Sequence, residues 1–193
     1  MVDIRIFGAS SAKLEKSYYD AARSFGAELA RRGHGLVFGG GRHGLMGACA
    51  EGVTAGGGRI LGIAPKFFDE PGVLYEKCTD FVFTDTMRER KQLMEDRSDA
   101  VAVLPGGIGT YEEFFEMLTL RQLGQSRKPV VILDINGYFA PMEELLRHTA
   151  RQKFMSSRCL ELFATVSSPG GALDYIESYT APASVPRLED YDK

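Results

Sequence analysis

Short apolar runs alternate along this chain with longer stretches in which apolar residues recur at helical spacing. The runs have no polar alternation, which is typical of strands buried on both faces of a parallel sheet. Strands are predicted at Ile4–Phe7, Gly35–Phe38, Arg59–Ala64, Phe81–Phe83, Ala100–Leu104, Pro129–Leu133 and Phe163–Val166. Helices are predicted at Tyr18–Arg32, Leu45–Val53, Met87–Arg97, a stretch ending near Leu123, Pro141–Gln152 and Gly171–Tyr179, while Pro65–Tyr75 is expected to be irregular.

Strands that alternate with helices predict an α/β fold, a Rossmann-like doubly wound parallel sheet with right-handed crossovers. The length of 193 residues fits a single domain, which we place at residues 1–180. Residues 181–193 contain prolines and acidic residues and are expected to form a mobile C-terminal tail, to which the sequence assigns no role. In sheets of this kind, ligands bind at the carboxyl ends of the strands.

Three predicted strands end in segments rich in glycine or small residues, at residues 8–10, 39–44 and 105–110. In a parallel sheet these three segments would lie at the same edge, and their convergence favours a binding site there. The three-glycine dinucleotide fingerprint is missing, as is the Walker lysine motif. The expected ligand is therefore a mononucleotide or another phosphorylated molecule, not NAD, and ATP hydrolysis is not expected.

The third of these segments, Leu104–Glu113, runs from a strand into a helix through Pro105, Gly106, Gly107, Ile108, Gly109 and Thr110. Glycines let backbone N–H groups approach a ligand at the positive end of the helix dipole, which suits a phosphate. An alternative is an ordinary glycine turn. In that alternative Thr110 and Glu113 form a capping box, and Glu113 only fixes the start of the helix.

A cluster of cations, Arg88, Arg90 and Lys91, opens the helix that Thr86 is expected to cap. Cations are unfavourable at a helix N-terminus, so their presence favours a functional role, although a solvated charged face is the alternative. Helix geometry lets Arg90 and Lys91 flank one site while Arg88 points elsewhere. Arg90 is the first candidate among them.

Glu113 is the best candidate carboxylate. The helix N-terminus and the nearby arginines are expected to keep it ionised. An ionised carboxylate can stabilise an oxocarbenium-like sugar, hold ribose hydroxyls or accept a proton from water. It would be a poor general acid, so a cation such as Arg90 is expected to help a departing base. The neighbouring Glu112 is expected to face solvent.

Other polar and aromatic residues rank lower. His43 lies in a strand-end loop, Ser10 and Ser11 could contact phosphate without acting as nucleophiles, and no group of residues suggests a metal site. Phe67, Phe68 and Tyr111 could stack on a base, with core packing the expected role of the two phenylalanines.

The formal net charge of -3 gives no general attraction to nucleic acid or to an anionic membrane. Cys49, Cys78 and Cys159 are an odd number without metal-like spacing and are expected to be reduced. No signal peptide or membrane span is recognised, so the expected location is cytoplasmic.

Two motifs together resemble those of a known family. Pro105-Gly106-Gly107-x-Gly109-Thr110-x-x-Glu113 follows Met87-Arg88-x-Arg90-Lys91, with Gly39-Gly40-Gly41 and Gly44-Leu45-Met46-Gly47 upstream. This arrangement resembles the Lonely Guy family of cytokinin riboside 5′-monophosphate phosphoribohydrolases, whose members were often mislabelled lysine decarboxylases. The resemblance extends from about Ile4 to Tyr179.

The resemblance implies a Rossmann-like fold, a homodimer or an assembly of dimers, and no cofactor. The implied reaction cleaves the N-glycosidic bond of an N6-modified adenosine monophosphate, or of AMP, to free base and ribose 5-phosphate. The implied catalytic residues are Arg90 and Glu113, and Glu70 is the nearest match to an acidic residue that contacts substrate. The full set of expected substrate contacts is Ser10, Gly40, Gly41, Glu70, Arg88, Lys91, Pro105, Gly106, Gly107, Ile108, Gly109 and Thr110.

Two other functions compete with hydrolysis. Related Rossmann-like proteins hold nucleotides or a molybdenum cofactor, or sense nucleotides, without cleaving them. The presence of both Arg90 and Glu113 favours the enzyme. A decarboxylase is the third alternative, but the sequence identifies no lysine as an anchor for pyridoxal phosphate.

Overall fold

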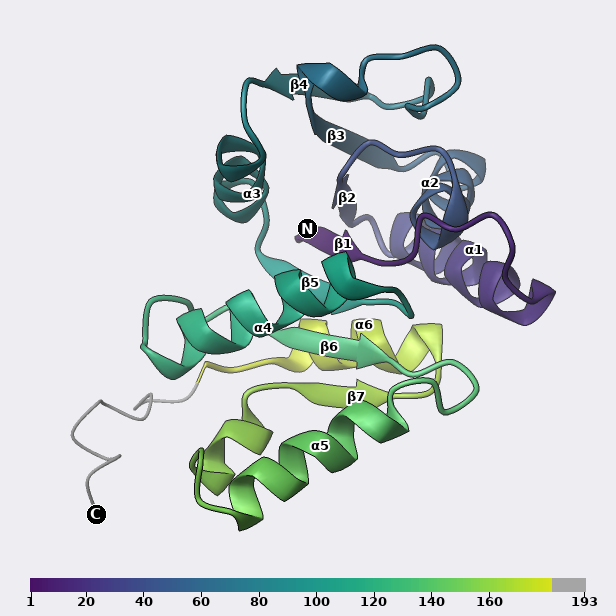
Figure 1. The fold of residues 1–193 in the computed structure, drawn as a ribbon. Helices are drawn as coiled ribbons and strands as arrows, with labels where there is room; N and C mark the ends of the chain where they lie inside the picture. Colours follow the sequence, from purple (N-terminus) through teal and green to yellow (C-terminus); the bar gives the residue numbers. More distant parts are fainter. Residues whose placement is uncertain (182–193) are drawn as a thin grey trace.

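The computed structural model describes residues 1–181, in which seven strands and six α-helices alternate (Figure 1). The strands are β1 (Asp3–Phe7), β2 (Gly35–Phe38), β3 (Arg59–Pro65), β4 (Asp80–Thr84), β5 (Ala100–Val103), β6 (Val130–Leu133) and β7 (Ala164–Val166). The helices are α1 (Lys16–Arg31), α2 (Gly44–Ala55), α3 (Met87–Asp96), α4 (Ile108–Gln122), α5 (Ala140–Arg151) and α6 (Pro169–Ser178), with short 3-10 helices η1 (Lys66–Phe68) and η2 (Ser157–Glu161).

The seven strands form one parallel sheet in the order β4-β3-β2-β1-β5-β6-β7. The chain runs outward from β1 in both directions, so the strand order reverses between β1 and β5. The segments after these two strands meet, because the Ala9 N–H donates a hydrogen bond to the Pro105 carbonyl at 2.9 Å. This reversal is the point at which sheets of this class bind ligands.

Helices cover both faces of the sheet. Apolar side chains of α1, α2 and α6 pack on one face against residues such as Ile4, Leu36 and Val131. On the opposite face, α4 and α5 pack against Val101 and Ile132. Helix α3 covers the same face near β2 and β3 through Met94. The inner strands β1, β2, β5 and β6 are buried on both sides, which explains their largely apolar sequences, whereas the edge strands β4 and β7 are more exposed.

The predicted fold class and all seven predicted strands are confirmed. Pro141 lies in the first turn of α5, and Thr86 caps α3 in a capping box with Glu89, as expected. Helix α6 begins two residues before the predicted Gly171, because the Ser168 hydroxyl accepts a hydrogen bond from the Gly171 N–H and caps the helix there. The two 3-10 helices were not predicted. Apart from Ala181, the predicted tail lies outside the described residues.

Among residues 1–181, no helix is both long enough and apolar enough to cross a membrane.

Close packing of α1 against α2 holds two of the strand-end loops together. A Cβ atom added to Gly26 would lie 2.0 Å from the Cys49 carbonyl oxygen, so the two helix backbones touch at this glycine. At the N-terminal end of α2, the Leu45 N–H donates a hydrogen bond of 2.8 Å to the Ala9 carbonyl. The position of α2 therefore fixes the loop after β1 against the loop after β2.

We expect Gly26→Ala to destabilise the protein by about 1–3 kcal/mol, because the added methyl group forces α1 and α2 apart. This loss outweighs the gain of about 1 kcal/mol in helix propensity. Denaturant unfolding measures the effect. Gly170→Ala is the matched control, because the nearest atom to its new Cβ is the far end of Arg32 at 3.7 Å, and its stability should not fall. Equal losses in both variants would contradict the packing argument.

Candidate active site

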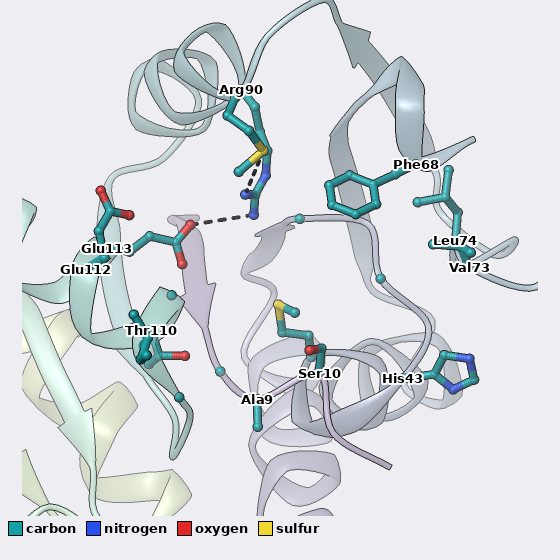
Figure 2. A pocket seen from close by; sticks show the side chains of 18 residues that line it. Ala9, Ser10, His43, Phe68, Val73, Leu74, Arg90, Thr110, Glu112 and Glu113 are labelled. Atoms are coloured by element: carbon teal, nitrogen blue, oxygen red, sulfur yellow. Dashed lines mark hydrogen bonds and ion pairs between the residues drawn. The ribbon is translucent and has the colours of Figure 1, made fainter. Parts of the chain in front are cut away.

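A cavity of about 540 Å³ opens at the carboxyl edge of the sheet, where β1, β2 and β5 end. It is lined by residues from the loops after these strands, from the region of η1 and from the first turns of α2, α3 and α4 (Figure 2). The lining residues are Gly8, Ala9, Ser10, Gly39, Gly41, His43, Met46, Phe68, Val73, Leu74, Met87, Arg90, Gly107, Ile108, Gly109, Thr110, Glu112 and Glu113. The three strand-end segments predicted to converge therefore do so in one cavity.

The N-terminus of α4 points its free backbone groups toward this cavity. Gly107 is the N-cap residue, no side chain caps the helix, and its first turn contains no acidic residue. The first N–H groups of a helix have no partner within the helix, and together with the helix dipole they attract an anion. The alternative in which Thr110 and Glu113 form a capping box is wrong, because Thr110 lies inside the helix and Glu113 is not a capping residue.

The glycines of this segment differ in what they do. A Cβ on Gly106 would lie 2.0 Å from the Thr110 hydroxyl, so this glycine is required by the protein's own packing. Cβ atoms on Gly107 and Gly109 would meet nothing within 4 Å. Glycine inside a helix costs about 1 kcal/mol relative to alanine, and packing does not explain that cost at Gly109. Close approach of a ligand to the backbone would explain it.

Arg90 and Glu113 point toward each other on one side of the cavity (Figure 2). Arg90 Nη2 lies 3.5 Å from Glu113 Oε1, and the two side chains are only 12% and 14% exposed. Gly39 makes room for the arginine, since a Cβ there would lie 2.3 Å from Arg90 Nη2. Arg90 Nε is buried and has no hydrogen-bond partner in the described residues. The two charged side chains are thus close together, largely shielded from water and short of hydrogen-bond partners. This leaves hydrogen-bond donors and acceptors for a ligand.

Burial raises the pKa of Glu113 above its ordinary value, and this effect exceeds the opposing attraction of Arg90 and Arg5. The sequence-based expectation that the helix N-terminus and the nearby arginines keep Glu113 ionised did not include desolvation of the charged form, which opposes the arginines and is the larger effect on the pKa. A carboxylate whose pKa is raised is a stronger base, which suits a group that accepts a proton from water.

Lys91 and Arg88 do not line the cavity in which they were expected to act. Lys91 Nζ binds Glu112 at 2.7 Å and Glu116 at 3.0 Å, and this ion-paired cluster links α3 to α4. Arg88 lies with Lys91 along a separate hollow beside Glu95 and Glu116. Their predicted contacts with substrate stay predictions. Glu112, expected to face solvent, is about half exposed and also lines the cavity.

The remaining predicted substrate contacts divide into two groups. Ser10, Gly41, Gly107, Ile108, Gly109 and Thr110 line the cavity, whereas Gly40, Glu70, Pro105 and Gly106 do not. Glu70 lies in the exposed segment after η1, near the cavity wall formed by Val73 and Leu74. His43, a lower-ranked candidate, is among the lining residues.

Apolar side chains form the wall opposite the Arg90–Glu113 pair, with Phe68, Leu74 and Val73 grouped there (Figure 2). Phe67 and Phe68 were expected to pack in the core, but they are 59% and 40% exposed because η1 carries them outward from the end of β3. Tyr111 packs edge-on against Phe139 and does not line the cavity.

Two supporting residues were missed by sequence reasoning. Tyr138 donates a hydrogen bond of 2.6 Å to the Gly106 carbonyl and so braces the glycine loop from outside the cavity. Arg5 lies on the central strand β1, is 3% exposed and acts electrostatically on Glu113. An arginine within an otherwise apolar strand, Ile4-Arg5-Ile6-Phe7, was the available signal.

Metal chemistry has no support in residues 1–181, where no group of three His, Cys, Asp or Glu side chains is placed to hold an ion. The cavity lining also contains no lysine that could form a Schiff base with pyridoxal phosphate.

Comparison with known sequences gives a consistent result. Residues 46–176 match the family model described as "Possible lysine decarboxylase". The chain is 37% identical over 177 residues to a "Probable cytokinin riboside 5'-monophosphate phosphoribohydrolase" of Oryza sativa subsp. japonica, covering 92% of this chain and 79% of the relative. It is 33% identical over 188 residues to a cytokinin riboside 5'-monophosphate phosphoribohydrolase of Arabidopsis thaliana, covering 97% and 86%.

Solved structures share the fold at lower sequence identity. The molybdenum cofactor binding protein of Rippkaea orientalis superposes with a TM-score of 0.71 at 21% identity, covering 92% of this chain and 96% of that chain. The Moco carrier protein of Chlamydomonas reinhardtii gives a TM-score of 0.70 at 21% identity, with 91% and 95% covered. At this level of identity the likeness concerns the fold alone.

The raised pKa of Glu113 predicts how Glu113→Gln changes stability with pH. In the wild type, the contribution of Glu113 is fully present below the unfolded-state pKa, near the ordinary value of 4.5, and is lost as the pH rises through the folded-state pKa. Glutamine has no such loss. The Tm of Glu113→Gln relative to wild type should therefore increase from about pH 4 to about pH 7.

Glu144→Gln is the control for this experiment. Arg151 lowers the pKa of Glu144, so its contribution is present at neutral pH and lost as the pH falls. The Tm of Glu144→Gln relative to wild type should show a weak opposite trend. A difference between Glu113→Gln and wild type that does not change with pH would mean that Glu113 is not desolvated.

Proposed function

Because this chain belongs to the Lonely Guy family of cytokinin riboside 5′-monophosphate phosphoribohydrolases, we propose that it hydrolyses nucleoside 5′-monophosphates at the N-glycosidic bond. The proposed substrates are N6-modified adenosine 5′-monophosphates, including cytokinin riboside 5′-monophosphate, and AMP. The products are the free base and ribose 5-phosphate.

The observation that carries this proposal is the position of the Arg90–Glu113 pair beside an uncapped helix N-terminus in one cavity. The first N–H groups of α4 suit a dianionic phosphate, and the open glycines Gly107 and Gly109 admit it closely. Glu113 lies one turn further along the same helix and can reach the sugar of a nucleotide held in this way.

The reaction breaks the bond between C1′ of the ribose and the base nitrogen, and water supplies a hydroxyl group to C1′ and a proton to the base. The carboxylate of Glu113 stabilises the positive charge that develops on the ribose ring and accepts a proton from the attacking water. Arg90 holds this carboxylate in place and presents a positive charge toward the departing base.

The apolar wall of the cavity supports the class of base. Phe68 and Leu74 offer a surface for a purine ring and for an apolar substituent on N6. Specificity for such a substituent from apolar contacts alone is modest, so AMP and its N6-modified forms are both proposed as substrates.

Two other functions are weighed against hydrolysis. A binding protein would hold the nucleotide in the same cavity without cleaving it, and the buried Arg90–Glu113 pair favours the enzyme. Decarboxylation of lysine is not favoured, because no lysine lines this cavity in the described part of the chain.

We also propose a homodimer or an assembly of dimers, no binding of nucleic acid, and a cytoplasmic location. Large apolar side chains that are exposed on α3 and α4 support the dimer, among them Met87, Ile108 and Phe115. Ile108 is 88% exposed beside the cavity, so a second copy covering it would adjoin the site.

Hydrolysis is tested by incubating the purified protein with AMP or with isopentenyladenosine 5′-monophosphate. Chromatography should show free base and ribose 5-phosphate in equal amounts, and the matching nucleosides without phosphate should be cleaved far more slowly. Glu113→Gln should lower kcat/KM by about 100-fold or more, since removal of one preorganised charged group typically has this effect.

Glu116→Gln is the matched control, because it removes a carboxylate one turn further along α4 that is bound to Lys91 outside the cavity. Its activity should remain near that of wild type. Tight binding of both nucleotides without release of base would contradict hydrolysis and favour a nucleotide-binding protein. Release of carbon dioxide from lysine would favour a decarboxylase.

The dimer is tested by sedimentation of the wild type and of Phe115→Glu. We expect the wild type to sediment as a dimer or a multiple of it, and the variant to dissociate because a charge is placed in an apolar contact. Thr119→Glu, at an exposed position one turn further on α4, should not change the assembly. A monomeric wild type at micromolar concentration would refute this part of the proposal.

A further inference from the structure

Arg5 is a buried cation with weak partners. It lies on the central strand β1, in register with Val37 on one side and Val101 on the other. Only 3% of the residue is exposed, its Nε has no hydrogen-bond partner in the described residues, and no carboxylate there forms an ion pair with it. Burial of a charge without a direct partner is strongly unfavourable. Stability alone does not explain this arginine.

The contacts that Arg5 does make place it beneath the active site. Its guanidinium carbon lies 5.0 Å from the centre of the Phe7 ring, and its Nη2 contacts the sulfur of Met117. Met117 lies four residues after Glu113 on α4, and residues at this spacing share one face of a helix. Arg5 therefore lies on the sheet side of the helix that carries Glu113, whereas Arg90 faces Glu113 in the cavity.

We propose that Arg5 is a positioning residue, a second cation that holds the Glu113 carboxylate in its charged form from the side away from substrate. The proposal rests on the proposed function of Glu113. In it, Arg90 remains free to turn toward the ligand, because the charge of Glu113 is balanced from beneath as well as from the cavity. No atom of Arg5 touches the reacting bond.

Several charged side chains surround Glu113 and Arg5 and act on the pKa of each group. Glu113 faces Arg90 and Lys91 on α3, Arg5 on β1 and Glu112 on its own helix. Arg5 faces Glu95 and Arg90 on α3 and Glu113 and Glu116 on α4, and it acts on Lys128 before β6. Arg5 lowers the pKa of Glu113 and is second only to Arg90 among the charges that do so.

The competing explanation is that Arg5 only balances Glu95, the strongest of its acidic partners. In that case Arg5 would stabilise the contact of α3 with the sheet, and its removal would leave the titration of Glu113 unchanged. The titration of Glu113 therefore separates the two explanations, whereas a loss of activity alone would not.

The experiment follows the titration of Glu113 by NMR in full-length protein labelled with ¹³C at the glutamate carboxyl carbon. The signal is identified by its loss in Glu113→Gln. In Arg5→Met, which removes the charge and keeps an unbranched apolar side chain, the midpoint should rise by about 1 pH unit. In Arg5→Lys, which restores a cation, it should return toward the wild-type value.

Arg121→Met is the matched control. Like Arg5, Arg121 is 3% exposed, and it lies on the same helix as Glu113. Unlike Arg5, it donates hydrogen bonds to the Lys128 carbonyl and the Tyr179 hydroxyl. Its replacement should leave the midpoint of Glu113 unchanged. The acidic limb of kcat/KM against pH should move upward in Arg5→Met by the same amount as the NMR midpoint, with kcat at high pH retained.

The outcomes separate this inference from the proposed function. If no nucleotide is cleaved but the midpoint shifts in Arg5→Met, the enzyme proposal fails and the link between Arg5 and Glu113 stands. If nucleotides are cleaved and the midpoint is the same in Arg5→Met as in wild type, the inference is overturned. Arg5→Gln is a second neutral variant, and failure of both neutral variants to fold would also overturn it, since Arg5 would then be a structural requirement.

Discussion

Arg90 and Glu113 lie 3.5 Å apart and are largely buried. The structure of the rest of the site depends on compensating the cost of burying these two charges. A buried carboxylate is stable only where cations or donors compensate it. The reversal of strand order between β1 and β5 provides this place, since it lets the loops after both strands meet beneath the first turn of α4. The topology of the sheet thus determines where the charge can be buried.

The glycine segment before α4 combines structural and ligand-directed positions. Gly106 and Gly39 leave room for Thr110 and Arg90, so their lack of a side chain serves the protein's own packing. Gly107 and Gly109 face open space, and the helix that they begin has no capping side chain. A helix start that is left uncapped and weakened by glycine is poor for stability and good for binding an anion. Replacing Gly107 and Gly109 to stabilise the helix would therefore remove the residues that the proposed function requires.

Much of this arrangement could be predicted from the sequence, and the properties that were not predicted share one cause. Apolar runs identify strands because burial on both faces leaves no polar alternation, and strand-end glycines identify the edge at which Arg90 and Glu113 meet. Sequence spacing did not show that Glu113 lies a turn inside the helix, that burial raises its pKa, or that Phe67 and Phe68 lie outside the core. These properties depend on which segments pack together over long distances. The strand Ile4-Arg5-Ile6-Phe7 marks Arg5 as unusual, but only the folded sheet shows that this arginine lies beneath α4.

The central claim is that the N-terminus of α4 holds the 5′-phosphate while Glu113 acts at the ribose. The most direct measurement is a crystal structure of Glu113→Gln with AMP, in which the substrate should persist uncleaved. The account predicts that the phosphate lies on the N–H groups of residues 108–110, with C1′ of the ribose next to the side chain at position 113 and Arg90 turned toward the base. A phosphate bound at another edge of the sheet, or a ribose directed away from position 113, would contradict it.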